Sequence, residues 1–364
     1  MNITIISLRG PTNNDLKGGA REYIKDLAVP WVKEGHNVNL ICGEEPKYSL
    51  PSEEVVEGIK IHRVKKEGFL TYSIWKYYQK KFSKLTDVLI ENMVSFPLLS
   101  PLYSRNKKKL TIIHHLTGKE YFKSHSLPKA ILGYSLEEYV IPFIYNKTKI
   151  LTVSELTTQE LVRIGIKDKN ISILSPGIDN MFFTPSEKSE SPLIVYVGRY
   201  DGKMGVKKVD HLIEAFNVLK GEIPNLNLVI AGPTKYKSEL ESLCKEKDIH
   251  LLGFITDNEK RELLQKAWVF ASPSTREGFG ITYIEANACG TPVVGYEIEG
   301  LKTVPKDAGI MVKSNDINSL TNALREIIIN DDLRNKMYEN ALNNSEKYTK
   351  TNFIKESVNI ISEF

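Results

Sequence analysis

The stretch that decides the fold of this chain reads REGFGITYIEA at residues 276–286, followed closely by GTPVV at residues 290–294. Gly278 and Gly280 leave backbone N–H groups bare at the point where a helix begins. A helix N-terminus presents unsatisfied donors and a partial positive charge, so it suits an anionic group. Two carboxylates, Glu277 and Glu285, frame these glycines.

The eight-residue spacing of Glu277 and Glu285 limits what they can bind. At a rise of about 1.5 Å per residue, the carboxylates stand roughly 10–12 Å apart along a helix, about the span from a sugar ring to a ribose. A hydrolase that works with two carboxylates on one bond needs them closer together. The pattern therefore indicates a nucleotide-sugar site. The alternative, a helix with two solvated glutamates, is disfavoured by the glycines and apolar residues around the pair.

Short apolar runs alternate with longer amphipathic stretches along the whole chain, which predicts parallel sheets built from β–α units. This happens twice, so we expect two doubly wound domains with ligands at the carboxyl ends of the strands. Residues 185–192 between them are polar and bounded by proline, as in a linker. The predicted strands cover residues 3–8, 38–42, 59–64, 88–90, 110–113 and 150–153, and then 193–197, 226–231, 249–252, 269–271, 293–296 and 310–312.

The glutamate pair, its glycines and the following ACGTPVV segment resemble the E-x7-E signature of retaining glycosyltransferases of family 4, which have the GT-B fold. The resemblance implies two Rossmann-like domains that face a central cleft. It places an acceptor-binding domain at residues 1–185 and a nucleotide-sugar-binding domain at residues 186–348. It also implies that the terminal helix, residues 349–364, packs back on the first domain.

Composition limits the class of protein further. The 364 residues exceed one compact core, and 41% hydrophobic with 26% charged residues are typical of a soluble globular protein. No apolar run is long enough to cross a bilayer and no signal-peptide pattern opens the chain, so we expect a cytoplasmic protein. The three cysteines support neither a disulfide framework nor a zinc site.

Basic residues concentrate in the first half of the chain. Residues 1–186 hold 26 Lys and Arg against 19 Asp and Glu, an excess of +7, whereas residues 187–364 hold 23 against 26, a balance of −3. The excess is densest in residues 60–84 and 105–109. It favours an anionic partner such as a diphosphate or a lipid headgroup. No nucleic-acid-reading motif accompanies it, so we expect no nucleic-acid partner.

The segment Val197-Gly198-Arg199, followed by Lys207 before a helical pattern, resembles the family's G-R…K-G-x-x-x-L-I-x-A-F motif. The resemblance implies that Arg199 and Lys207 neutralise the donor diphosphate, Arg199 as a fork and Lys207 as a point charge. Lys208 stands where the family usually has glycine, and Lys203 is an alternative to Lys207. The alternative for both lysines is an ordinary solvated side chain.

Two weaker matches lie in the first half. Gly18 and Gly19 follow the first strand, where the family has a glycine loop near the donor diphosphate; the alternative is a flexible turn. His114 ends the strand at residues 110–113, and the family carries a histidine there, near the sugar and the leaving phosphate. The alternative is a structural histidine. The resemblance gives the remaining nucleotide-sugar contacts to Gly253, Phe254 and Ile255 after one strand and to Gly278, Phe279, Gly280 and Glu285.

These observations predict a retaining hexosyltransferase that moves a hexose from a UDP- or GDP-sugar to an acceptor hydroxyl, with Glu277 orienting the sugar. The acceptor is expected to be a glycolipid, a lipid-linked oligosaccharide or a surface polysaccharide. Neither a cofactor nor a catalytic metal is expected, because no Asp-x-Asp pair occurs and the resemblance implies metal-independent transfer. The alternatives are a nucleotide-sugar epimerase of the same fold, a relative of glycogen phosphorylase or synthase, and a non-catalytic subunit that binds sugar nucleotides.

A helical pattern over residues 72–85 bears on the acceptor. It carries an apolar and aromatic face beside a row of lysines, Lys76, Lys80 and Lys84. In one interpretation the apolar face packs on the sheet and the lysines are solvated. In the other, the helix rests on an anionic membrane and gives access to a membrane-embedded acceptor, which would make the protein peripheral to the membrane.

Overall fold

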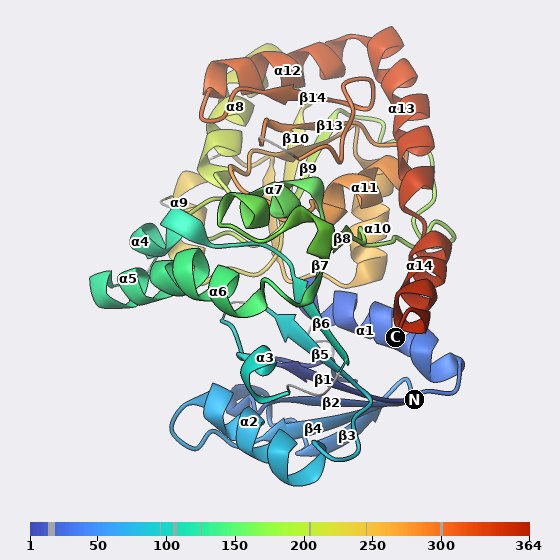
Figure 1. Ribbon diagram of the computed structural model, residues 1–364. Coiled ribbons are helices and arrows are strands. Elements are labelled where there is room, and N and C mark those ends of the chain that lie inside the picture. The colour runs from blue at the N-terminus through green and yellow to red at the C-terminus, as the bar shows by residue number, and fades with distance from the viewer. Residues whose placement is uncertain are drawn as a thin grey trace. The chain divides into compact units, whose positions relative to one another are not determined.

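The computed structural model describes residues 1–13, 19–94, 96–104, 108–124, 126–203, 205–244, 246–298 and 301–364. The chain divides into two compact units: unit 1 comprises Met1–Pro176 and Thr351–Phe364, and unit 2 comprises Gly177–Lys350. Each unit has its own sheet, with helices in the connections between strands (Figure 1). The predicted fold class, two doubly wound α/β domains, is therefore confirmed.

Unit 1 is built on an eight-stranded sheet in the order β3-β4-β2-β1-β5-β6-β7-β8. Neighbouring strands are parallel except for the pair β3 and β4. The two outermost strands were not predicted, because both are short and mostly exposed. The strands are β1 (Asn2–Ser7), β2 (Asn37–Gly43), β3 (Glu53–Val56), β4 (Ile59–Val64), β5 (Val88–Met93), β6 (Lys108–Ile113), β7 (Lys149–Thr152) and β8 (Ile171–Ile173).

Unit 2 is built on a six-stranded parallel sheet in the order β11-β10-β9-β12-β13-β14. The central strands are buried on both faces, which explains their continuous apolar sequence. All six had been predicted. They are β9 (Leu193–Val197), β10 (Asn227–Ala231), β11 (Ile249–Gly253), β12 (Val269–Ser272), β13 (Val293–Tyr296) and β14 (Gly309–Val312).

The helices connect these strands. Those of unit 1 are α1 (Gly19–Lys33), α2 (Leu70–Lys81), α3 (Ser100–Tyr103), α4 (Tyr121–Ser124), α5 (Leu127–Ser135), α6 (Ile141–Tyr145), α7 (Glu155–Arg163) and the terminal α14 (Lys350–Ser362). Those of unit 2 are α8 (Val209–Glu222), α9 (Lys237–Leu243), α10 (Asp257–Lys266), α11 (Ile281–Ala288), α12 (Ile317–Ile329) and α13 (Asp331–Ser345). None of the helices in the described ranges combines the length and hydropathy that a membrane crossing requires.

The terminal helix α14 packs on α1 and so belongs to unit 1 rather than to the unit that precedes it in sequence (Figure 1). The Trp31 Nε1 atom donates a hydrogen bond to the Ser357 carbonyl oxygen at 2.9 Å. The rings of Tyr23 and Phe353 meet edge to face, with their centroids 5.4 Å apart. Aromatic contacts and a buried indole hydrogen bond therefore hold α14 in place.

The segment between the two halves differs from the free linker that we expected. We placed the domain boundary at residue 185, whereas the structure groups Gly177–Lys350, and therefore this segment, with unit 2. The Lys188 Nζ atom explains part of this, because it donates to the Cys289 carbonyl oxygen at 3.1 Å and to Thr291 Oγ1 at 2.6 Å. Burial lowers the pKa of Lys188 to about 8. A segment that is polar in sequence is thus bonded to the second unit.

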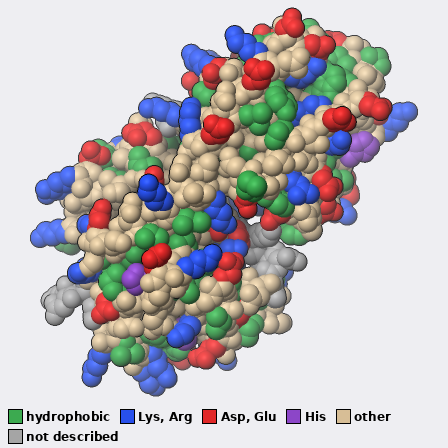
Figure 2. All heavy atoms as spheres, turned by 90° about the vertical axis from the view of Figure 1, so that its right-hand side faces the viewer, with side chains coloured by type: hydrophobic (Ala, Val, Ile, Leu, Met, Phe, Trp, Pro, Cys, Tyr) green, Lys and Arg blue, Asp and Glu red, His purple; other side chains and the backbone are tan. Residues whose placement is uncertain are grey.

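Helix α2 turns its apolar face to the sheet. Ile74 and Tyr78 are fully buried in a cluster with Ile6 and Leu89. Lys76 forms an exposed ion pair with the acidic residue at position 67, at 2.8 Å. For its central apolar residues, α2 is therefore a packed helix rather than a membrane-facing one. On the face of the molecule that Figure 2 shows, basic and acidic side chains are interspersed with small apolar patches.

Candidate functional site

The candidate site of unit 2 begins at the carboxyl ends of β9, β10 and β11. The strand order reverses at β9, and this is where doubly wound sheets bind ligands. Three glycines bring these strand ends together: Gly198 N donates to Ala231 O at 2.9 Å, and Gly232 N donates to Gly253 O at 2.6 Å. A Cβ on Gly232 would lie 2.0 Å from the Gly198 carbonyl oxygen, so only glycine fits there. The result is a strip of bare backbone at the switch point.

Lys207 and Glu277 meet at this edge of the sheet. The Lys207 Nζ atom lies 2.5 Å from Glu277 Oε1, and each side chain is 19% exposed. Their two loops are joined by the backbone, because Thr275 N donates to the Val206 carbonyl oxygen at 2.8 Å. Half-buried charges in contact attract more strongly than fully solvated ones. The predicted diphosphate cation and the predicted sugar-orienting carboxylate thus form one ion pair.

Asp201 shapes the loop that carries Lys207. Its carboxylate accepts hydrogen bonds from the backbone N of Val206 at 3.0 Å and of Lys207 at 3.2 Å. Among the contacts of the described residues, Glu277 is reached by Lys207 and not by Lys203. Of the two lysines left open by the sequence, Lys207 therefore has the better position.

Arg199 follows Gly198 at the end of β9, and its side chain is exposed. The Tyr196 hydroxyl donates to the Arg199 carbonyl oxygen at 3.1 Å. Burial raises the pKa of Tyr196 well above its usual range, the Glu277 charge raises it further, and the Arg199 charge opposes the rise. The Tyr196 hydroxyl is therefore within electrostatic range of both charges, so Arg199 belongs to the same corner of the unit as Glu277.

The turn at residues 278–280 precedes α11, which begins at Ile281. Gly280 has a φ of 78°, a left-handed conformation that favours glycine. Glu285 therefore lies about one turn inside the helix. The Phe279 ring is buried within unit 2 against another aromatic ring, and the contact of Phe279 with a nucleotide-sugar stays a prediction.

Glu285 pairs with Lys260, a residue of α10 that the sequence did not single out. Glu285 Oε1 accepts from the Lys260 Nζ atom at 2.6 Å, and the same ammonium group lies 5.1 Å from the Phe183 ring centroid. Glu285 Oε2 is buried and has no hydrogen-bond partner among the residues that the structure describes. A buried carboxylate oxygen without a donor is costly, so this atom is suited to a donor supplied by a ligand.

The turn after β11 presents an aromatic ring. Gly253 has a φ of 67°, Phe254 is 57% exposed and Ile255 is half-buried. An exposed ring at a strand end offers a face on which a planar group can stack. Within the described part of the chain, no three His, Cys, Asp or Glu side chains gather in a way that fits a metal ion.

In unit 1, polar side chains from three adjacent strands meet at their carboxyl ends. His114 Nε2 contacts Asn92 Oδ1 at 2.8 Å, and Asn92 Nδ2 donates to Ser7 Oγ at 3.0 Å. Because an amide oxygen only accepts, His114 carries its proton on Nε2. Burial lowers the pKa of His114 to about 3, and the neighbouring His115 adds to this. His114 is therefore a neutral, oriented imidazole.

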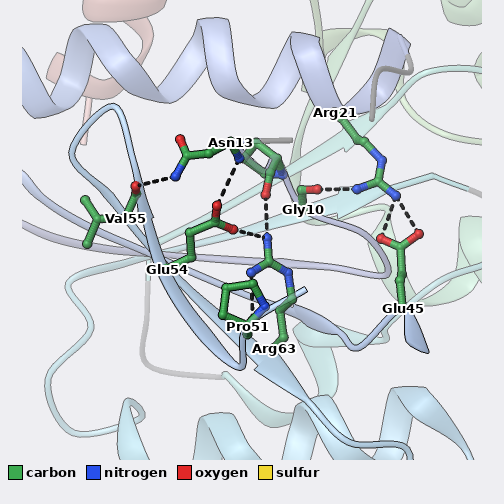
Figure 3. Close-up of polar contacts among 9 residues, drawn as sticks. Gly10, Asn13, Arg21, Glu45, Pro51, Glu54, Val55 and Arg63 are labelled. Atoms are coloured by element: carbon green, nitrogen blue, oxygen red, sulfur yellow. Dashed lines mark hydrogen bonds and ion pairs between the residues drawn. The ribbon is translucent and has the colours of Figure 1, made fainter. Parts of the chain in front are cut away.

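The loop after β1, residues 8–13, leads toward the predicted glycine pair. Gly18 lies outside the described residues, and Gly19 is the exposed first residue of α1. Arg21 on α1 holds the loop from one side: it donates to the Gly10 carbonyl oxygen at 2.6 Å and, through Nη2, to both carboxylate oxygens of Glu45 at 2.5 and 2.6 Å (Figure 3).

Arg63 on β4 holds the same loop from the other side. Its side chain is only 1% exposed and donates to the Pro11 carbonyl oxygen at 3.0 Å and to Glu54 Oε2 at 2.6 Å. The other oxygen of Glu54 accepts from Asn13 N at 3.0 Å (Figure 3). Hydrogen bonds from Asn13 and Arg63 hold the pKa of Glu54 below its usual value, although burial opposes this. We call Arg21, Glu45, Arg63 and Glu54 the loop clamp.

Several of these residues were missed by sequence reasoning. Gly232 had a usable signal, since an Ala-Gly-Pro sequence follows a predicted strand. Asn92 likewise follows the apolar core of β5. Lys260 and the loop clamp had no usable signal in the sequence, because their partners lie on other elements and no spacing in the sequence links them.

Comparison with known proteins places the chain among glycosyltransferases. The model of glycosyl transferases group 1 matches residues 177–344, and the model of glycosyltransferase family 4 matches residues 17–181. An uncharacterised glycosyltransferase of Methanocaldococcus jannaschii is 26% identical over 99% of this chain and 97% of its own length.

Two solved structures share the fold. Sucrose-phosphate synthase from Thermosynechococcus elongatus has a TM-score of 0.80 at 18% identity, covering 100% of this chain and 98% of that one. The Anabaena protein HepE, solved in complex with UDP and glucose, has a TM-score of 0.79 at 16% identity, covering 100% of both chains. These likenesses agree with the two parallel-sheet units and identify the fold as GT-B.

Proposed function

We propose a specific activity for this chain, which belongs to the family 4 glycosyltransferases: it transfers a hexose from a UDP- or GDP-sugar to an acceptor hydroxyl with retention of configuration. The observation that carries the proposal is the ion pair of Lys207 and Glu277 beside Gly198 and Arg199 at the switch point of unit 2. This corner combines a carboxylate for sugar hydroxyls with two cations for a diphosphate. The UDP and glucose bound by HepE support the same donor class.

In this proposal the cations act on the leaving group. The acceptor oxygen forms a bond to the anomeric carbon while the bond from that carbon to the donor phosphate breaks, and the acceptor proton passes to the departing diphosphate. Arg199 and Lys207 stabilise the charge that develops on the diphosphate. Glu277, which holds Lys207 without ligand, turns to the sugar hydroxyls. No protein group is needed as a general base.

The ribose and the nucleobase of the donor are assigned to residues whose chemistry suits them. The unpartnered Oε2 of Glu285 accepts from a ribose hydroxyl, and Lys260 orients that carboxylate. The nucleobase lies against the turn of Gly253, Phe254 and Ile255. In unit 1, the neutral His114 offers a fixed imidazole to the sugar or the phosphate, which suits hydrogen bonding rather than charge neutralisation.

Product stereochemistry tests the activity. Purified protein is incubated with an α-linked UDP- or GDP-hexose and a panel of acceptors, and the anomeric configuration of the product is read by proton NMR. An α-linked product supports the proposal, and a β-linked product contradicts it. Turnover of donor without acceptor, yielding a free sugar or its epimer, would instead indicate an epimerase.

Metal independence is part of the proposal, because Arg199, Lys207 and bare backbone amides meet the diphosphate charge. Transfer should therefore survive EDTA at near-normal kcat. Complete loss on chelation that Mn²⁺ or Mg²⁺ restores would contradict this part.

A further inference from the structure

In the helical run from residue 127 to residue 145 of unit 1, small residues are buried and several large apolar residues are exposed. It consists of α5, a π-helical turn (Leu136–Val140) and α6 without interruption. On α5 the buried residues are small: Ala130 is fully covered, and Gly133 lies so close to the Tyr121 ring that a Cβ would be 2.6 Å from it. The large apolar residues Leu127, Ile131 and Leu132 of α5 are exposed, whereas Ile141 and Tyr145 on α6 are buried. On a helix whose outer face meets only water, the exposed residues are polar and the large apolar residues are buried.

The exposed apolar residues form continuous rows. Positions four apart share one helix face, and one such row contains Leu127, Ile131, Tyr139 and Phe143, interrupted only by the small Ser135. Phe143 is 89% exposed, Tyr139 68% and Leu127 65%. The adjacent row adds Pro128, the exposed Leu132 and the half-buried Leu136, Val140 and Ile144. Contiguous apolar patches of this kind mark interaction sites on soluble proteins. We call these two rows the apolar stripe.

Charges around the apolar stripe favour an anionic partner. Lys129 and Lys147 are exposed, and neither is in an ion pair with another described residue. Both acidic residues of the run are already engaged: Glu138 pairs with Arg163 at 2.8 Å, and Glu137 is buried with three donors. The charge that the stripe offers to its surroundings is therefore positive.

The stripe is connected to the proposed site of unit 1. The Glu137 carboxylate accepts from the backbone N of Thr117 at 2.8 Å and of Gly118 at 2.7 Å, and these residues directly follow the strand end that carries His114. Glu137 lies in the π-helical turn, a feature found frequently at functional sites. A buried carboxylate of the run that carries the apolar stripe therefore holds the loop that follows His114.

We propose that the apolar stripe seats unit 1 on an anionic lipid bilayer, where it meets an acceptor carried by a lipid. The acceptor part rests on the proposed function. The interface of an anionic membrane binds surfaces of this composition. Large aliphatic and aromatic side chains insert at the acyl boundary, and the flanking lysines are attracted to the lipid headgroups. This assigns the membrane surface to residues 127–145 rather than to α2, whose central apolar residues pack on the sheet.

Flotation with lipid vesicles tests this surface. Vesicles of phosphatidylcholine alone are compared with vesicles of equal parts phosphatidylcholine and phosphatidylglycerol. Wild type should float only with the anionic vesicles and release at high salt. Ile131→Asn with Phe143→Asn should lower the bound fraction at least tenfold, because the substituted side chains already face outward and folding is untouched.

Two sets of controls separate the surface from the rest of the protein. Val218→Asn with Ile329→Asn replaces exposed apolar residues of unit 2 and should float like wild type. Lys129→Glu with Lys147→Glu should weaken flotation several-fold, whereas Lys76→Glu with Lys80→Glu, on α2, should not. If the α2 variant alone weakened flotation, the stripe would not be the membrane surface.

Further outcomes would overturn the inference. These are wild type that floats with neither vesicle, an Ile131 and Phe143 variant that floats normally, or a dimer in sedimentation that this variant abolishes while no vesicle binds. Thermal stabilisation by the best nucleotide-sugar is measured on the same samples. Stabilisation by a nucleotide-sugar without flotation would contradict only the proposed membrane surface. Flotation without stabilisation by any nucleotide-sugar would contradict only the proposed function.

Discussion

Glu277 has one partner in the structure and a different one in the proposed reaction. Its Oε1 atom lies 2.5 Å from the Lys207 Nζ atom. In the proposed reaction Glu277 exchanges this contact for sugar hydroxyls, and Lys207 turns to the diphosphate. The ion pair thus holds both side chains in place before the substrate arrives. A pair of this kind contributes to catalysis only if both members contact the reacting molecule.

Glu277→Gln, Lys207→Met and Arg199→Met should therefore each lower kcat by about 10²–10³ with much smaller effects on thermal stability. The double variant of Lys207 and Glu277 should lose less than the sum of the two single losses, because the groups act together. Steady-state kinetics with the best donor and calorimetric unfolding measure both quantities. Near-normal kcat in the Glu277 and Arg199 variants would refute their roles.

His114 makes stability depend on pH. Its folded pKa of about 3 lies below the ordinary value of 6.5, so between these values the unfolded chain binds more protons and stability falls as pH falls. From pH 7 to pH 5, wild type should lose about 2 kcal/mol more than His114→Gln. Urea unfolding followed through Trp31, with Trp75 and Trp268 replaced by Phe, reports on unit 1. Equal losses in both proteins would mean that the imidazole is not buried as described.

At the residue scale, the sequence predicted the groups that carry charge and missed those that orient them. Glu277 was singled out by its spacing from Glu285 and by the family resemblance, and Lys207 by the resemblance alone, with Lys203 as its alternative. Asn92 and Lys260 act on residues of other elements, and such contacts arise only when strands or helices become neighbours. The burial of the Phe279 ring could not be predicted, because a motif does not say which way a side chain points.

At the scale of elements, the loop clamp holds residues 10–13, which follow β1, although this stretch contains a glycine and a proline. Gly10 is held by Arg21, Pro11 by Arg63 and Asn13 by Glu54. Buried ion pairs are expensive to desolvate, and their retention is better explained by a requirement for one conformation than by stability. We therefore regard the loop clamp as a device that positions the entry to α1.

Arg63→Met alone should destabilise unit 1 by about 3–5 kcal/mol, because Glu54 is left buried without its partner. Arg63→Met with Glu54→Leu should recover most of that stability, since both charges are gone. If the clamp positions the loop, transfer by the double variant still shows a raised KM or lowered kcat. Full recovery of both stability and kinetics would reduce the clamp to a dispensable packing feature.

The twelve predicted strands are all present, because buried parallel strands are nearly continuous apolar runs. Two strands escaped prediction for the opposite reason: β3 and β8 lie at sheet edges, are short and carry exposed residues. The prediction of a free linker at residues 185–192 also differs from the structure. A polar composition indicated a free segment, whereas hydrogen bonds from Lys188 bind it to unit 2.

At the scale of the whole molecule, the terminal helix is the part whose place is least evident from its position in the chain. Its apolar spacing predicted a helix, and its assignment to the first domain came only from the family resemblance. The structure supplies the physical reason: the Trp31 indole and the Tyr23 ring on α1 both meet α14. Unit 1 is therefore complete only when the end of the chain has returned to it.

Deletion of residues 350–364 should lower the unfolding midpoint of unit 1 and shift the emission of Trp31 to the red, because the buried indole gains solvent. The signal of Trp268 in unit 2 should change little. Fluorescence of variants that keep only one of these tryptophans separates the two units. An unchanged midpoint for unit 1 would show that α14 contributes nothing to it.

The central claim, that unit 2 holds a nucleotide-sugar at the corner of Arg199, Lys207 and Glu277, is tested most directly by ligand-induced stabilisation. A panel of UDP- and GDP-sugars is screened by thermal unfolding. At a hundredfold excess over Kd, the true donor should add about 2.7 kcal/mol to the free energy of unfolding. We predict that at least one sugar nucleotide does so with wild type and fails with Arg199→Met. Stabilisation by no member of the panel, or equal stabilisation of Arg199→Met, would contradict the claim.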